Sequence, residues 1–182
     1  MNKIGLIAGN RQFPLLFSAA AKKNNYYVVA IAIKGDTSTW ISRYADKVYW
    51  LGLREFGRIF DIFKQEGITK VIMAGQISPR RLFSREVEAD SQLKGLLDSL
   101  KDKKADTIFG AIAGKLKDNG LELMDSTIFI KDLLPSKGVL TELEPPPELW
   151  QDVNFGLELA KAVAGLDIGQ SVAVKDKAVV AV

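Results

Sequence analysis

Apolar runs alternate with helically spaced apolar residues along this chain, and the alternation predicts the fold class. Apolar runs ended by glycine or polar residues predict strands at 3–9, 27–33, 47–51, 70–75 and 121–124. Apolar positions three or four residues apart predict helices at 13–20, 53–63 and 106–119. Strands that alternate with helices favour an α/β fold, here a Rossmann-like, mostly parallel sheet. The aromatic stripe of Phe56, Phe60 and Phe63 is then predicted to face the core.

A proline-rich loop divides the chain into two predicted domains. It runs from Leu134 to Pro147, and a helix between Val153 and Ala164 follows it. Two short apolar runs around Lys175-Asp176-Lys177 then predict a β-hairpin. We therefore predict a Rossmann-like domain at 1–135, and a linker with part of a second α/β domain at 136–182. A helix and a hairpin of about 40 residues can hardly bury a core, so they either dock on the first domain or belong to a longer chain.

The first strand ends abruptly in Gly9-Asn10, and a helix pattern begins at once with Pro14 in its first turn. A helix start is a natural phosphate site, because free N–H groups and the positive end of the helix dipole coincide there. The turn is not the dinucleotide fingerprint G-x-G-x-x-G, since Arg11 stands where the second glycine would be. Two interpretations stay open: a nucleotide or phosphate site, and the ordinary packing of a tight turn.

A second strand end repeats this combination of glycine and carboxamide. Gly75-Gln76 closes the fourth predicted strand as Gly9-Asn10 closes the first. The carboxyl ends of parallel strands lie side by side, and ligands bind there at a switch point of strand order. Asn10 and Gln76 are therefore predicted to converge on one ligand.

Several charged residues each have two interpretations. Asp36, after the second strand, either caps the next helix or meets a ribose hydroxyl, as the acidic residue after the second Rossmann strand does. Asp106 is a predicted N-cap. The basic segment 79–104 is either a solvated helical surface or a patch that faces phosphate or a membrane. Its members are Arg80, Arg81, Arg85, Lys94, Lys101, Lys103 and Lys104, interrupted by Leu82-Phe83 and Leu96-Leu97.

Composition excludes several classes of active site. The 182 residues carry a net charge of +3 and include no cysteine and no histidine. A thiolate nucleophile, a zinc site with sulfur or imidazole ligands and a Ser-His-Asp hydrolase are therefore excluded, and an enzyme that acts on phosphate would need a carboxylate-held Mg²⁺. The weak charge does not predict a nucleic-acid partner. No signal segment precedes the first strand and no apolar run approaches the roughly 20 residues of a membrane span, so we expect a cytoplasmic protein.

Several groups of residues, taken together and in order over the whole chain, resemble one family, the UDP-2,3-diacylglucosamine pyrophosphatases of the LpxI type. These groups are Ile4-Gly-Leu-Ile-Ala-Gly-Asn10 with Gln12-Phe-Pro-Leu-Leu16, Met73-Ala-Gly-Gln76, Asp106-Thr-Ile108 with Ala111-Ile-Ala113, Gly138-Val-Leu-Thr141 and Leu166-Asp-Ile-Gly-Gln-Ser-Val172. The resemblance implies a Rossmann-like nucleotide- or UDP-sugar-binding domain and a C-terminal catalytic domain that enclose the substrate between them.

The same resemblance implies a reaction. It is the Mg²⁺-dependent hydrolysis of UDP-2,3-diacylglucosamine to lipid X and UMP in the lipid A biosynthesis of Gram-negative bacteria. A UDP-sugar lipid is the implied partner, a peripheral contact with the inner membrane and a homodimer stay open, and a non-catalytic nucleotide-binding module is the alternative. Candidates for the nucleotide or diphosphate site are Gly9, Asn10, Gln12, Gly75 and Gln76. Further candidates for polar contacts, each also explained as a cap or turn residue, are Asp106, Thr107, Thr141, Gln170 and Ser171.

The chain departs from the family pattern at two places. The family usually has Gly-Asn-Gly where this chain has Gly9-Asn10-Arg11, which adds a cation to the turn. The family also continues past the hairpin into a Glu-Gly-Thr-Asp segment whose aspartate is held to be catalytic, whereas Val182 is the last residue here. Unless the chain is a fragment, we expect a ligand-binding protein with little or no hydrolase activity. Asp106 and Asp152 are the carboxylates that could then face the substrate.

Overall fold

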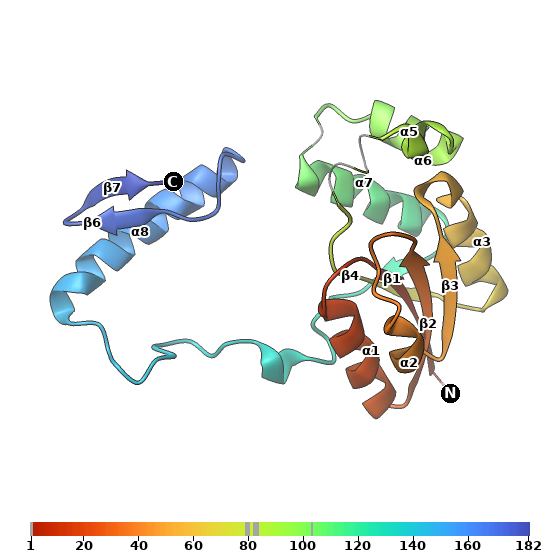
Figure 1. The fold of residues 1–182 in the computed structure, drawn as a ribbon, viewed down its shortest axis with the longest axis horizontal. Coiled ribbons are helices and arrows are strands. Elements are labelled where there is room, and N and C mark those ends of the chain that lie inside the picture. The colour runs from red at the N-terminus through yellow and green to blue at the C-terminus, as the bar shows by residue number, and fades with distance from the viewer. Residues whose placement is uncertain (1, 79–80, 82–83, 103) are drawn as a thin grey trace. The chain divides into compact units, whose positions relative to one another are not determined.

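The computed structural model describes residues 2–78, 81, 84–102 and 104–182 of the chain. These residues form two compact units, Met1–Leu134 and Pro135–Val182, coloured red to green-blue and blue in Figure 1. Arg80, Leu82, Phe83 and Lys103, which belong to the predicted basic segment, lie outside the described residues.

A five-stranded parallel sheet forms the centre of the first unit. Its strands are β1 (Asn2–Ala8), β2 (Tyr26–Ile33), β3 (Lys47–Leu51), β4 (Lys70–Ala74) and β5 (Glu122–Leu123), in the order β3-β2-β1-β4-β5. This is the order of the first five strands of a Rossmann sheet, and it reverses between β1 and β4. The predicted α/β fold with a mostly parallel sheet is confirmed.

Helices cover both faces of this sheet (Figure 1). The helices α1 (Phe13–Lys23) and α2 (Ile41–Tyr44) pack on one face, and α3 (Arg58–Gln65), α5 (Arg85–Glu88), α6 (Ser91–Asp98) and α7 (Ala105–Asp118) contribute to the core on the other. Along β2, Val28, Ala30 and Ala32 join the first core, whereas Val29, Ile31 and Ile33 join the second. Side chains alternate along a strand, so a strand buried on both faces needs an unbroken apolar run.

The helix predicted at 53–63 is interrupted. A 3₁₀ turn, η1 (Leu53–Glu55), is followed by α3, which begins only at Arg58. Gly57 donates its backbone N–H to the Asp90 carboxylate at 3.1 Å, and Glu55 accepts the N–H of Gly52 at 2.9 Å. Glu55 thus caps the 3₁₀ turn, whereas the Asp90 carboxylate competes with a helical hydrogen bond at Gly57, which explains the interruption.

The aromatic stripe is part of the core, as predicted. Phe56, Phe60 and Phe63 are all buried, and the rings of Phe56 and Phe60 meet edge to face with their centroids 5.5 Å apart. This geometry suits the ring quadrupoles, so the pair contributes beyond its buried area.

The predicted N-cap of the helix at 106–119 is wrong. The N-cap position of α7 is Lys104, and Asp106 lies exposed in the first turn. Among the described residues no side chain caps α7, but the Asp102 carboxylate lies just before the helix. It accepts the N–H of Lys104 at 3.1 Å, and its hydrogen bond with the Thr107 hydroxyl is the main cause of a lowered pKa of Asp102. The stop at Asn119-Gly120 is confirmed, with Gly120 at φ 75°.

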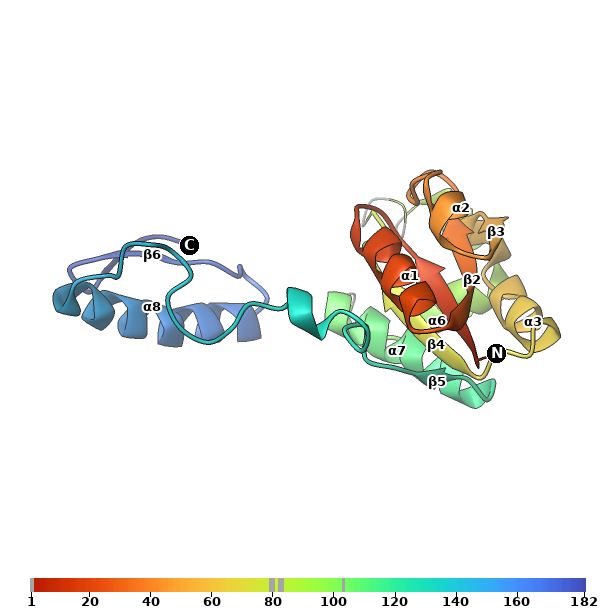
Figure 2. The same ribbon diagram turned by 90° about the horizontal axis from the view of Figure 1, so that it is seen from below.

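The second unit follows η2 (Lys131–Leu133) and consists of α8 (Pro147–Gly165) and a hairpin of β6 (Ala173–Lys175) and β7 (Ala178–Ala181), as predicted. The helix lies along the two strands in Figure 2. Asp176 and Lys177 both have positive φ, 52° and 57°, as a two-residue type I′ turn requires. Asp152 of α8 accepts both of their N–H groups, at 2.8 and 2.7 Å, so this carboxylate stabilises the turn.

Replacing Phe60 by alanine should lower the free energy of unfolding by about 3–5 kcal/mol, because a buried aromatic ring is lost and a cavity is left. Urea denaturation of the purified protein measures the change. Phe109→Ala is the matched control, since that ring is 48% exposed and its loss should cost clearly less. Equal losses in the two variants would contradict the core assignment.

Candidate functional site

Two turns meet at the carboxyl edge of the sheet, where the strand order reverses. The backbone N–H of Gly9 donates to Ala74 O and that of Asn10 donates to Gln76 O, each at 2.8 Å. The paired strands β1 and β4 end in register, with Ala8 opposite Ala74. The structure therefore brings Gly9-Asn10 and Gly75-Gln76 together at the position where open α/β sheets bind their ligands.

The glycines of both turns are required by this close approach. A Cβ at Gly9 would lie 2.6 Å from the N and O atoms of Gln76. Gly75 has φ +82°, and a Cβ there would lie 2.4 Å from Asn10 O. Packing of one turn against the other thus explains why both residues are glycine, so the glycines alone do not indicate a ligand.

The start of α1 has the charge pattern of an anion site. Gln12 is its N-cap residue and makes no side-chain capping hydrogen bond, and the first turn contains no acidic residue. Arg11 precedes it, exposed and at φ 67°, a left-handed conformation that glycine adopts without strain. This conformation explains physically why glycine suits the position. The positive end of the helix dipole and the Arg11 charge act in the same direction at this turn.

The side chain of Asn10 contains a hydrogen-bond acceptor that the described residues leave unsatisfied. Its Oδ1 is buried and has no partner among the described residues. Buried polar atoms are nearly always hydrogen-bonded, so each exception needs an explanation. A ligand group that donates a hydrogen bond, such as a sugar hydroxyl or the N–H of a nucleobase, would supply the missing partner.

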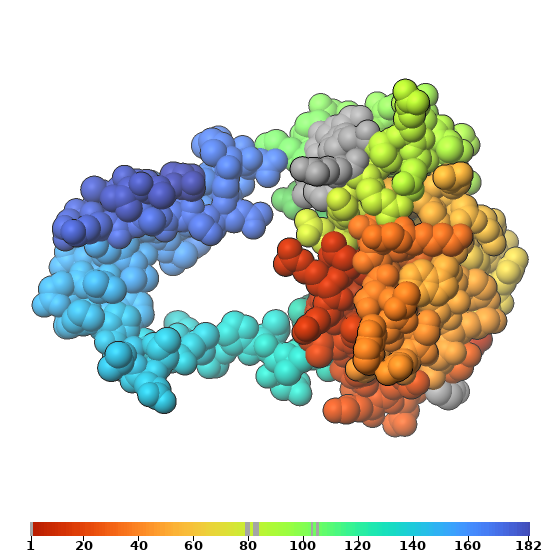
Figure 3. Space-filling view, viewed as in Figure 1, coloured from red at the N-terminus to blue at the C-terminus, as the bar shows by residue number. Residues whose placement is uncertain are grey.

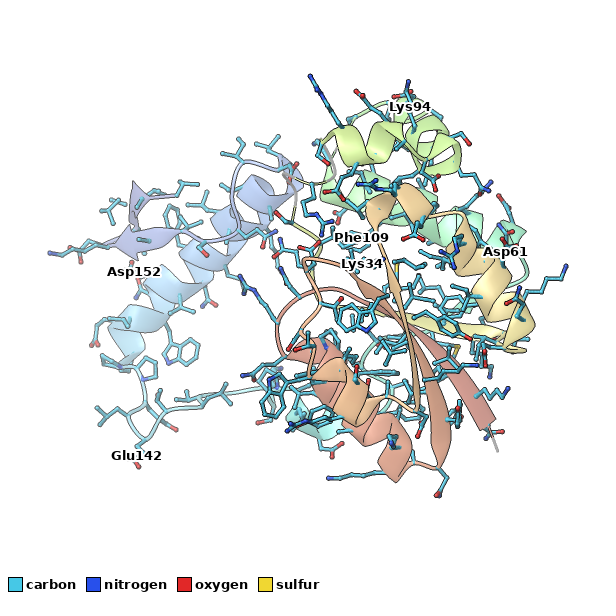
Figure 4. All side chains as sticks on the ribbon, turned by 45° about the vertical axis from the view of Figure 1, so that its right-hand side comes forward. Lys34, Asp61, Lys94, Phe109, Glu142 and Asp152 are labelled. Atoms are coloured by element: carbon cyan, nitrogen blue, oxygen red, sulfur yellow. The ribbon has the colours of Figure 1, made fainter. Side chains whose placement is uncertain are left out.

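An apolar cavity of about 210 Å³ lies beside the two turns. Its lining comes from the ends of β1 to β4 and from η1, α3 and α7, and it consists of Ile7, Gly9, Ile33, Leu51, Gly52, Leu53, Phe56, Ile59, Met73, Ala74, Gly75, Gln76, Ile77, Ile108, Phe109 and Ile112. Phe109, labelled in Figure 4, is the exposed aromatic residue of this lining. The cavity could not be predicted from the sequence, because its apolar residues are indistinguishable from core residues by periodicity.

Asp36 does not cap α2, whose N-cap position is Trp40. Both of its carboxylate oxygens are engaged: Oδ2 pairs with Arg81 Nη1 at 2.7 Å, and Oδ1 accepts the N–H of Ser78 at 3.3 Å. The Asp36 side chain is only 5% exposed, so the carboxylate is not accessible to a ribose hydroxyl.

Arg81 lies neither on a solvated surface nor in a patch that faces phosphate or a membrane, because its guanidinium pairs with the carboxylates of Asp36 and Glu86. Burial opposes its charge, but the Glu86 hydrogen bond and the charges of Asp36 and Glu86 outweigh that effect and raise the pKa of Arg81. The other described basic residues of the segment are exposed, as on a solvated surface: Arg85, Lys94, Lys101 and Lys104.

The remaining candidates lie on other elements of the chain. Thr107 lies in α7, where its hydroxyl bonds Asp102. Thr141 donates its hydroxyl to Leu143 O at 2.8 Å, and Gln170 and Ser171 are exposed between α8 and β6. These last three residues belong to the second unit. The site is therefore described from the first unit alone.

The described residues contain no preformed cluster of metal ligands. Among them, no group of three or more histidine, cysteine or acidic side chains is placed to hold a metal ion. Asp36 is a buried carboxylate just after the carboxyl end of β2, and it is already bonded to Arg81 and Ser78.

In the part of the chain that the structure describes, no helix has the length and apolar character needed to cross a bilayer.

Comparison with protein families decides the classification. Residues 3–133 match the LpxI N-terminal domain, and residues 136–182 match the LpxI C-terminal domain. The chain belongs to the LpxI family. It is similar to the UDP-2,3-diacylglucosamine pyrophosphatase LpxI of Caulobacter vibrioides, with 28% identity over 187 residues. That alignment covers all of this chain and 65% of the relative, so the chain spans about two thirds of the relative's length. The resemblance found in the sequence is confirmed.

Similarity to solved structures is weak. The pyruvate carboxylase of Rhizobium etli aligns at 13% identity and a TM-score of 0.41, over 68% of this chain and 10% of that one. The N5-carboxyaminoimidazole ribonucleotide synthetase of Thermotoga maritima aligns at 21% identity and a TM-score of 0.36, over 66% of this chain and 31% of that one. The description of the fold therefore rests on the strand order itself.

Gly75→Ala should destabilise the protein more than Gly67→Ala. Both glycines have positive φ, +82° and +66°, but a Cβ at Gly67 would have no neighbour within 4 Å, whereas one at Gly75 would clash with Asn10 O. Gly67→Ala measures the backbone strain alone, about 1–2 kcal/mol. Thermal and urea unfolding compare the variants, and equal losses would show that the two turns do not need their close contact.

Proposed function

We propose that this protein hydrolyses the diphosphate of UDP-2,3-diacylglucosamine and releases lipid X and UMP, a step of lipid A biosynthesis. The Caulobacter relative is a pyrophosphatase named for this substrate. One observation supports carrying the activity over: Gly9, in the turn that leads to a helix start suited to an anion, also lines an apolar cavity. A substrate with a diphosphate and fatty acyl chains presents the same two chemistries side by side.

The diphosphate and its nucleotide are assigned to the two turns. The N-terminus of α1 and the exposed Arg11 supply positive charge, while Asn10 and Gln76 supply carboxamides. Phosphoryl transfer depends mainly on positioning and on stabilising charge, so groups of this kind align the diphosphate and lower the cost of its developing charge.

An acyl chain is assigned to the apolar cavity. Cavities of about 150 Å³ lined by leucine, isoleucine and phenylalanine stay dry and bind small hydrocarbons such as benzene. The cavity here, at about 210 Å³, is large enough for a segment of alkyl chain. Burying each methylene there would contribute about 0.8 kcal/mol.

Magnesium is the cofactor that the family resemblance implies, and we assign it no residue, because the described residues contain no group of three or more metal-ligating side chains. We place the reaction in the cytoplasm with a peripheral contact to the inner membrane, since the proposed substrate is a lipid. A non-catalytic nucleotide-binding module is the second candidate, favoured by the same lack of an acidic cluster in the described residues. Release of UMP from UDP-2,3-diacylglucosamine, followed by chromatography, distinguishes the enzyme from the binding module.

Asn10→Ala and Gln76→Ala should each weaken the binding of UDP by about 1 kcal/mol or more, because each removes a hydrogen bond to a charged or polar ligand group. Titration calorimetry measures the affinity. Asn24→Ala is the control, since this carboxamide lies at the opposite end of α1 and bonds Ala20 O. Unchanged affinity in both site variants would contradict the assignment.

Ile112→Trp should fill the cavity and remove the advantage of the acylated substrate over UDP. Its effect on UDP itself should be small, because the turns are unchanged. Binding of the two ligands is compared for the variant, for the parent protein and for Lys117→Trp, an exposed position near the end of the same helix. If Ile112→Trp kept the full preference for the acylated ligand, the acyl chain would have to bind elsewhere.

A further inference from the structure

The turn after β2 presents Asp36 rigidly. Gly35 takes φ 87°, and the Thr37 hydroxyl donates to Ala8 O while it accepts the N–H of Ile33 at 2.8 Å. Thr37 is buried and the Asp36 side chain is only 5% exposed. The Asp36 carboxylate therefore has a fixed position at the carboxyl edge of the sheet, one strand away from the Gly9-Asn10 turn.

Arg81 bridges this turn to the segment that follows β4. Its Nη1 donates to Asp36 Oδ2 at 2.7 Å and to Lys34 O at 2.5 Å, and its Nη2 donates to Glu86 Oε2 at 2.8 Å. Its guanidinium packs over Gly35, where a Cβ would lie 3.0 Å from Nη1. Figure 3 shows the yellow-green segment after β4 against the orange segment after β2. One lysine nitrogen could not reach all three acceptors, whereas the planar arginine fork can.

The same carboxylate also holds the backbone of the candidate site. Asp36 Oδ1 accepts the N–H of Ser78, two residues after Gln76. Gln76 O in turn accepts the N–H of Asn10. The segment 76–78 is thus tied at one end to the β1 turn and at the other to the β2 turn, and Ile77 between these ties lines the apolar cavity.

A carboxylate this buried depends on its partner. An unpaired buried charge is strongly unfavourable, and removing one member of such a pair leaves the other uncompensated. Arg81 therefore compensates the charge of the Asp36 carboxylate, which also accepts the N–H of Ser78. It also neutralises a negative charge that would otherwise oppose an anionic ligand at the neighbouring turns.

We propose that Asp36 and Arg81 are positioning residues, whose ion pair holds the segment 76–78 in the geometry that binds the ligand. This inference rests on the proposed function for its ligand, UDP, but the positioning itself is tested without any ligand.

The experiment compares the parent protein with Asp36→Asn, Arg81→Lys and the double variant. Asp46→Asn is the matched control. Its carboxylate also accepts a backbone N–H, from Val28 at 2.8 Å, and pairs with a cation, Lys22 at 3.0 Å, but it precedes β3 at the opposite edge of the sheet. For each protein, hydrogen exchange of the Ser78 and Asn10 amides is measured by NMR without ligand. The Kd for UDP and the melting temperature are measured in parallel.

In Asp36→Asn and Arg81→Lys, both amides should exchange about tenfold faster and the Kd for UDP should rise by a similar factor. In the double variant, the amide exchange rates and the Kd for UDP should be no higher than in the more strongly affected single variant, because the two residues act as one unit. Asp46→Asn should leave both readouts unchanged, even at an equally lowered melting temperature. Arg81→Lys keeps the charge, so its effect reports the geometry of the fork.

Unchanged amide exchange in both single variants would overturn the proposal. A rise of the Kd in Asp46→Asn that matches the rise in Asp36→Asn would also overturn it, because the effect would then follow global stability. If the parent protein failed to bind UDP, the proposed function would fail, and with it the ligand role of the pair. Faster exchange of Ser78 and Asn10 would still establish that Asp36 and Arg81 position the segment.

Discussion

The contact between the two glycine turns is the constraint on which the rest of the site depends. The backbone of Gly9-Asn10 lies against the backbone of Gly75-Gln76, close enough that neither glycine has room for a Cβ. This contact brings the start of α1 and the mouth of the apolar cavity to the same edge of the sheet. Because the turns follow adjacent parallel strands, a displacement of one turn would move the start of α1 and the cavity wall together.

Asp36 distinguishes this site from the dinucleotide sites of other Rossmann-like sheets. In those sites the acidic residue after the second strand binds a ribose hydroxyl. Here both oxygens of the carboxylate are bonded within the protein, by Arg81 and Ser78. The acidic residue after the second strand thus contacts the ligand in dinucleotide-binding proteins, whereas here it holds the backbone of the segment 76–78. This difference agrees with the lack of the G-x-G-x-x-G fingerprint.

Much of the fold could be predicted from the sequence, because burial on both faces of a sheet demands unbroken apolar runs. The strands, the stop of α7 at Asn119-Gly120 and the buried stripe around Phe60 follow from periodicity and turn chemistry alone. The proximity of Asn10 and Gln76 follows from the parallel sheet, since neighbouring strands end at one edge. The partners of the carboxylates could not be predicted, and for that reason neither role considered for Asp36, the helix cap or the ribose contact, matches the ion pair with Arg81.

The sequence by itself determined the α/β class, the family and the two turns at which a ligand is expected, because these depend on local spacing and on residue type. Only the tertiary structure decided that Asp36 pairs with Arg81, 45 residues away, and that Asp90 interrupts a helix 33 residues before it. It also decided that an apolar cavity adjoins the turns. Ion pairs and cavities are made by side chains from several elements at once, and the packing of those elements, rather than any local pattern, sets their distances.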